Sequence, residues 1–131
     1  MLFSEKITAN FKKTRLAYDF SIKNISDLLD LKTTSVIGNI ETHKGTPSLN
    51  LVIKFALTFG VSIDWLLGFS DTIFTPASVS IAEKDLEDRL SNTDSSLALH
   101  MLLTNYDKWR DPDTRQQHYS LAAVSYTHLT L

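Results

Sequence analysis

Residues 33–68, TTSVIGNIETHKGTPSLNLVIKFALTFGVSIDWLLG, decide the fold of this chain. The stretch holds three apolar runs at helical spacing. Each run follows a hydroxyl residue that can accept the unpaired N–H groups of a first helical turn: Thr33, Ser48 and Ser62. Gly60 is placed as a left-handed C-cap of the middle run, and Gly68 ends the last one. The pattern therefore predicts three short helices, at residues 33–41, 49–59 and 63–67.

Upstream of this stretch, the apolar spacing predicts two more helices. Ile7, Phe11, Thr14 and Tyr18 share one helical face, so residues 4–18 form the first helix, which breaks at residues 19–20. Ser21 can cap the second helix, and residues 30–32 form a tight turn before the third. The expected core of the five helices consists of Ile25, Leu28, Leu31, Ile37, Ile40, Leu49, Ile53, Ala56, Val61 and Leu66.

Downstream, a composition change marks a boundary. Residues 70–79 contain a proline and small polar residues, and they are interpreted as a linker. Ser80 and Glu83 form a capping-box pattern that opens a helix to about residue 90. A further helix is expected at residues 94–110, where an apolar stripe suits contacts with a second copy: Ala98, Leu102, Tyr106 and Trp109. Residues 80–123 are thus expected to form a short helical arm that supports dimerisation.

The last eight residues, VSYTHLTL at 124–131, are interpreted as having a different origin from the rest of the chain. They match the reading-frame translation of a common transposon-based sequencing adapter. We therefore expect residues 124–131 to be an adapter-derived tail without function.

Composition excludes several classes of protein. The chain of 131 residues has no cysteine, so disulfides, thiolate zinc sites and cysteine nucleophiles are excluded. No apolar run approaches 18 residues, and the N-terminus lacks the pattern of a signal peptide, so a cytoplasmic protein without a membrane span is expected. The four histidines lack ligand spacing, and phosphate-loop, hydrolase and metalloprotease motifs are absent. We expect no enzyme activity, no cofactor and no metal.

The two halves of the chain carry net charges of opposite sign, but both charges are small. The net charge of −2 divides into +1 over residues 1–71 and −3 over residues 72–131. A nucleic-acid binder usually carries a strong basic patch. Charge alone therefore neither identifies nor excludes a partner of this kind.

The ordered landmarks of the first half resemble a known family. Residues 20–21, 37–41, 47–49 and 60–68, together with Lys44, are similar to the Cro/CI-type (XRE-like) helix-turn-helix repressors of phages. The resemblance covers residues 3–70 and implies an all-α chain, with a five-helix lambda-repressor-like domain at residues 1–69 followed by the arm. It also implies a sequence-specific transcriptional regulator, a repressor that binds an inverted repeat in double-stranded DNA as a homodimer and blocks polymerase.

The resemblance also assigns roles to residues. Outward positions of the recognition helix, which read base edges in the major groove, correspond to Thr33, Thr34, Ser35, Gly38 and Asn39. Asn39 suits a bidentate contact with adenine. Lys44 matches a basic position that touches phosphate. His43 is expected as a loop residue near phosphate instead of a metal ligand, and Lys23 is a further expected DNA-binding residue. Arg15 and Glu41 match a pair that forms an internal salt bridge between the first helix and the recognition helix.

Two alternatives stay open. An antitoxin-like regulator would bind DNA through the first half and a partner protein through the arm. A protein-interaction module would keep the fold without binding DNA. This second alternative is motivated by Ile22, which stands where family members usually have glutamine, by Asp30 in the turn, and by the near-neutral charge.

Overall fold

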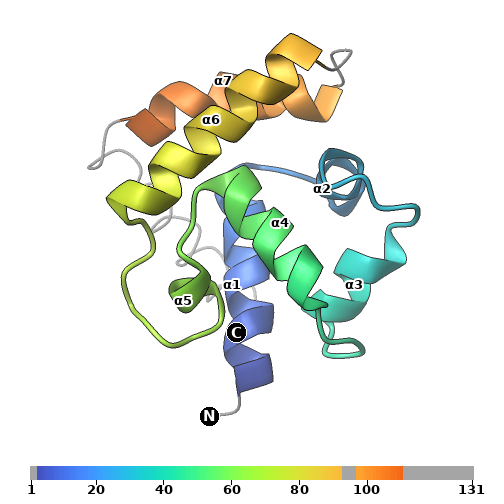
Figure 1. Cartoon of the computed structure of the whole chain (residues 1–131). Coiled ribbons are helices and arrows are strands. Elements are labelled where there is room, and N and C mark those ends of the chain that lie inside the picture. Colours follow the sequence, from blue (N-terminus) through green and yellow to red (C-terminus); the bar gives the residue numbers. More distant parts are fainter. Residues whose placement is uncertain (1–2, 93–96, 111–131) are drawn as a thin grey trace.

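The structure, a computed structural model, describes residues 3–92 and 97–110, and all regular structure in those two ranges is helical (Figure 1). The elements are α1 (Phe3–Ala17), α2 (Ile22–Leu28), α3 (Ser35–Glu41), α4 (Leu49–Phe59), α5 (Ile63–Leu66), α6 (Pro76–Asn92) and α7 (Leu97–Arg110). Five helices within residues 3–69 and an all-α fold are therefore confirmed.

Helix α1 runs through the middle of the molecule. It packs on α3 and α5, while α4 packs on α5 and α6, and α2 packs on α3 and α7. Aromatic rings fill the centre: Phe55 lies 4.2 Å from Phe11 and 4.8 Å from Phe59 between ring centroids, and Tyr18 lies 5.2 Å from Phe59. Helix α3 is left at the periphery, and α6 and α7 cross the opposite end, at the top of Figure 1. One face of α3 is therefore free to meet a partner.

The first three helices end in the same way, with a non-glycine residue in the left-handed conformation. These residues are Asp19, Asp30 and His43, at φ 55°, 56° and 62°. In each case the next residue donates its N–H back to the last turn: Phe20 to Arg15, Leu31 to Ser26, and Lys44 to Asn39, at 3.1, 2.9 and 2.8 Å. This is the Schellman arrangement, which pairs the orphan carbonyls of a helix end. It turns the chain sharply after each helix at some conformational cost.

The N-terminal caps follow the sequence pattern with one exception. Ser21, Ser48 and Ser62 accept hydrogen bonds from Asn24, Leu51 and Trp65 N–H as expected. The predicted cap at Thr33 is wrong. Helix α3 begins at Ser35, its N-cap is Thr34 without a side-chain bond, and the Thr33 hydroxyl instead pairs with the Ser35 hydroxyl at 2.7 Å. Thr33 and Thr34 therefore lie in the turn before the recognition helix.

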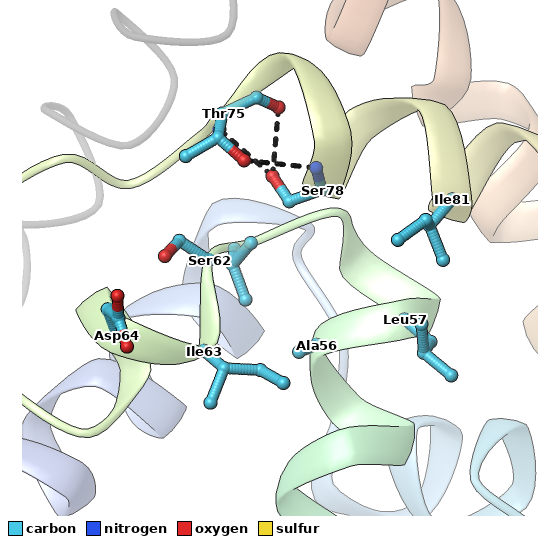
Figure 2. Close-up of a pocket in the computed structure, with 9 residues that line it drawn as sticks. Ala56, Leu57, Ser62, Ile63, Asp64, Thr75, Ser78 and Ile81 are labelled. Atoms are coloured by element: carbon cyan, nitrogen blue, oxygen red, sulfur yellow. Dashed lines mark hydrogen bonds between the residues drawn. The ribbon is translucent and has the colours of Figure 1, made fainter.

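Helix α6 begins at Pro76, four residues before the expected cap at Ser80. Ser78 N–H donates to Thr75 Oγ1 at 3.0 Å and Thr75 N–H donates to Ser78 Oγ at 2.9 Å, a reciprocal capping box that Figure 2 shows. The Ser78 hydroxyl also reaches the Gly60 carbonyl at 2.8 Å. Helix α6 thus begins inside residues 70–79, the segment interpreted as a linker. The capping box forms at Thr75 and Ser78 because Ser78 also bonds to Gly60, at the end of α4.

Helices α6 and α7 pack on the preceding helices. Ala82 and Leu86 of α6 are buried, and Arg89 donates to the Leu28 carbonyl at 2.9 Å, at the end of α2. Leu102, a member of the expected dimer stripe, is 1% exposed and therefore belongs to the core of its own chain. The other stripe side chains, Ala98, Tyr106 and Trp109, lie outside the described side chains, as does the tail at 124–131.

The expected core is correct except at Leu31 and at two positions of α4. Leu31, in the turn after α2, is only half-buried. Leu49 is 69% exposed and Ile53 is 36% exposed, because α4 turns a neighbouring face inward. That face carries Leu51, Val52, Phe55, Ala56 and Phe59. Trp65 of α5 is 5% exposed and belongs to the core.

An ion pair fixes α3 on α1. Arg15 Nε lies 2.7 Å from Glu41 Oε2, and Arg15 Nη2 lies 2.8 Å from Glu41 Oε1, so the contact is bidentate. Arg15 Nη1 donates to the Phe20 carbonyl at 3.0 Å. Both side chains are largely buried. Thr8 adds a second tie from α1 by donating its hydroxyl to the Ile40 carbonyl at 2.8 Å.

The left-handed cap at Asp30 generates the first prediction. Asp30→Gly should raise the free energy of unfolding by about 0.5–1 kcal/mol, because glycine adopts this conformation without a Cβ clash. Asp27→Gly removes the same side chain three residues earlier, inside α2, and should lower that free energy by about 0.5–1 kcal/mol. Urea unfolding of both variants measures the difference, and effects of equal sign would contradict the account.

The buried ion pair generates the second prediction. Glu41→Ala should lower the free energy of unfolding by about 3 kcal/mol, because the Arg15 guanidinium loses its carboxylate while it stays largely buried. The double variant Arg15→Met with Glu41→Leu should recover most of that loss, since it removes the charge as well. Denaturant unfolding checks both variants. Equal losses in the single and double variants would show that packing, rather than the unpaired charge, is responsible.

Candidate nucleic-acid interface

Helices α2 and α3 form the helix-turn-helix unit, with residues 29–34 as the turn. On α3, Ile37 and Ile40 are buried, whereas Ser35 and Asn39, one turn apart, are exposed. A Cβ built on Gly38 would meet no atom within 4 Å, so the outer side of the helix is open at this point. A helix of this kind can enter the major groove with its outer side chains toward base edges.

Asn39 is held at its backbone by the loop that follows α3. Its carbonyl accepts N–H groups from both Lys44 and Gly45, at 2.8 and 3.1 Å. A Cβ on Gly45 would lie 3.3 Å from the Asn39 Cβ, which is tighter than an ordinary contact. The loop therefore packs against the base of the Asn39 side chain and leaves the amide end exposed. Sequence patterns did not indicate this support, because it joins a helix to a loop through space.

The residues expected beside phosphates are all exposed: Lys23, His43 and Lys44. His43 and Lys44 take their positions from the left-handed turn at the end of α3. One half-buried cation on α4 was missed, Lys54, whose Nζ lies 3.4 Å from Asp30 Oδ2. Asp30 thus has a cation beside it. The two residues are 24 positions apart in the sequence, which explains why no local pattern indicated the pair.

The remaining predicted residues are placed as follows. Thr33 and Thr34 are exposed, but in the turn instead of on α3. Arg15 and Glu41 lie behind α3 and orient it. Ile22, at the start of α2, is half-buried and packs against the core, so its side chain serves the fold.

A hollow of about 230 Å³ lies elsewhere, between the end of α4 and the starts of α5 and α6 (Figure 2). Its lining is mainly apolar and includes Leu57, Ile63 and Ile81. The hydroxyls of Thr75 and Ser78 each accept the backbone N–H of the other residue, and the Ser78 hydroxyl donates to the Gly60 carbonyl. Because ligand pockets usually measure about 300–1,000 Å³ and offer unpaired polar groups, this hollow is a weak candidate for a small-molecule site.

One titratable group is visibly perturbed. Partial burial lowers the pKa of Lys13, whose Nζ lies 5.9 Å from the centre of the Trp65 ring. This contact joins α1 to α5 and takes no part in the α3 face.

Among the helices that the structure describes, none has the length and hydropathy needed to cross a bilayer.

Comparison with known proteins agrees with this geometry. Residues 11–66 match a family model described as Helix-turn-helix. Comparison with the curated proteins and with the solved structures gives no significant match. The matched segment contains α2, the turn and α3, together with the C-terminal part of α1 from residue 11 onward and all of α4 and α5. Residues 11–66 therefore form a helix-turn-helix domain similar to those of the Cro/CI (XRE) type, a kind of domain found in DNA-binding transcription regulators.

Proposed function

We propose that this chain is a sequence-specific repressor that binds an inverted repeat in double-stranded DNA as a homodimer. The observation that carries the proposal is Asn39. It is exposed on the outer face of α3, its backbone is fixed by Lys44 and Gly45, and α3 itself is fixed by the Arg15–Glu41 pair. An amide held in this way suits the N6 and N7 atoms of adenine in the major groove.

The surrounding residues divide into two roles. Ser35, one turn before Asn39, and Thr34 in the preceding turn offer hydroxyls to a base edge or a phosphate. Lys23, His43 and Lys44 lie at the margins of the α2–α3 unit and contact phosphates, which sets affinity without selecting sequence.

A dimer is needed for selectivity. A helix of seven residues reads only a few base pairs, which is too little to select one site in a genome. Two copies of α3 separated by about 34–36 Å would read successive major grooves on one side of the duplex. We assign the dimer contact to the arm, where Leu97 and Leu103 of α7 are exposed.

Selection from random double-stranded DNA at low salt tests the proposal. Enrichment of a two-fold symmetric site supports it. Absence of any enriched sequence would instead favour a protein-interaction module, for which Ile22 is the supporting observation. A second protein that co-purifies with the chain through α6 and α7 would favour the antitoxin-like alternative.

Substitutions at Asn39 and Lys44 should separate the two roles. Asn39→Ala should cost about 1–3 kcal/mol on the selected site and relax its sequence preference. Lys44→Ala should weaken binding to all sequences about equally and reduce the slope of log affinity against log salt by about 1. Titrations of a panel of duplexes at several salt concentrations measure both effects. Indistinguishable behaviour of the two variants would refute the division of roles.

The dimer contact predicts a change in molecular mass. Sedimentation equilibrium at micromolar concentration should give twice the chain mass of 14.8 kDa. Leu97→Glu with Leu103→Glu should shift the protein toward the single-chain mass, because two charges would enter an apolar contact. Leu49→Glu, at an equally exposed leucine of α4, is the matched control and should leave the mass unchanged. A single-chain mass for the unaltered protein at all concentrations would exclude the dimer.

A further inference from the structure

Val36 is an exposed apolar residue on the recognition helix. It is 38% exposed, whereas the residues that anchor α3 to the core, Ile37 and Ile40, are almost completely buried. The other exposed positions at this end of the unit, Thr33, Thr34 and Ser35, carry small polar side chains. The core therefore does not account for an apolar residue at position 36.

Val36 also has a defined place relative to Asn39. Residues three apart on a helix lie on neighbouring positions of the surface, with Cβ atoms about 5–6 Å apart. Both residues are exposed, and both lie within α3, which is fixed at its far side by Glu41. Valine in a helix is held in one main side-chain rotamer, so its two methyl groups present a fixed apolar surface next to the amide.

The major groove offers one apolar group for such a surface. Every base edge there presents hydrogen-bond donors and acceptors, and thymine alone adds a C5-methyl group. An apolar side chain that enters the groove beside an adenine-reading amide gains most by covering this methyl group. A cytosine at the same place would present only a C5–H to the valine, so the methyl contact would be lost.

We propose that Val36 is a specificity-determining residue that packs on the C5-methyl group of a thymine next to the adenine read by Asn39. The distance between the two Cβ atoms spans one to two base-pair steps of about 3.4 Å, so the thymine lies one or two positions from that adenine. This inference rests on the proposed function, since it requires α3 to enter the major groove.

The test uses the full chain and the operator obtained by selection. Each thymine near the adenine is replaced in turn by deoxyuridine, which removes only the C5-methyl group. One such replacement should weaken binding of the unaltered protein about fourfold, the effect of exposing one methyl group. Val36→Thr keeps the shape of the side chain but replaces one of its two methyl groups by a hydroxyl, so it should reduce the fourfold ratio between the thymine and deoxyuridine operators.

Control variants separate this effect from others. Ile81→Thr, an exposed isoleucine of α6, should keep the fourfold ratio between the two operators. Thermal unfolding of Val36→Thr should match that of the unaltered protein within a few degrees.

Three outcomes overturn the inference. One is a deoxyuridine effect that persists in full in Val36→Thr, and another is an operator without thymine next to the adenine. In both cases selection has succeeded and the proposed function stands. Failure to select any DNA removes the proposed function and this inference together.

Discussion

The geometry of the α3 face depends on the hydrogen bonds that the Arg15 guanidinium donates. A single cation holds the carboxylate at the end of α3 through two hydrogen bonds and the carbonyl of Phe20 just before α2 through a third. It therefore joins α1 to both halves of the helix-turn-helix unit. Because the pair is buried, substitution of either partner destabilises the fold by leaving the other charge uncompensated. A buried pair of this kind adds little net stability compared with apolar packing, so its main effect is to specify orientation.

The short helices of the unit need such external constraints. Isolated helices of seven residues are not stable in water. Helices α2 and α3 form because their inner faces are packed and their C-terminal ends are capped, and α2 has a capping box at Ser21 as well. At the C-terminal ends, left-handed residues close the backbone hydrogen bonds that would otherwise remain open. At the end of α2, Arg89 supplies a further donor to the Leu28 carbonyl. Helix α6 thus stabilises the unit from the side away from α3.

Local signals explain what the sequence could predict. Ser21, Ser48, Ser62 and Gly60 act within four residues of their own helices, and each has the expected place in the structure. The wrong predictions concern helix starts, where two similar N-cap patterns lie close together in the sequence. Thr75 and Ser80 both precede helical sequence, and the bond from Ser78 to Gly60, 18 residues away, accompanies the earlier start.

The same reasoning applies to the site. The sequence predicts roles for Asn39 and Lys44 through the family resemblance, and their closeness was predictable because residues on one helix and its adjoining loop stay close in any fold of this type. It could not find the support of Asn39 by Gly45, the exposure of Leu49, or the pairing of Lys54 with Asp30. Each of these depends on which face of a helix turns inward, and several faces of α4 are apolar enough to do so.

The weak charge of the first half finally limits how DNA can be recognised. Residues 1–71 carry a net charge of only +1, and one of the cations, the half-buried Lys54, is already beside Asp30. Non-specific affinity for DNA arises almost entirely from phosphate neutralisation, so a weakly charged surface gains little of it in a single copy. Under the proposed function, most of the discrimination would then come from base-edge contacts on α3. Since those contacts are few on one helix, the proposed recognition of an operator requires two copies acting together.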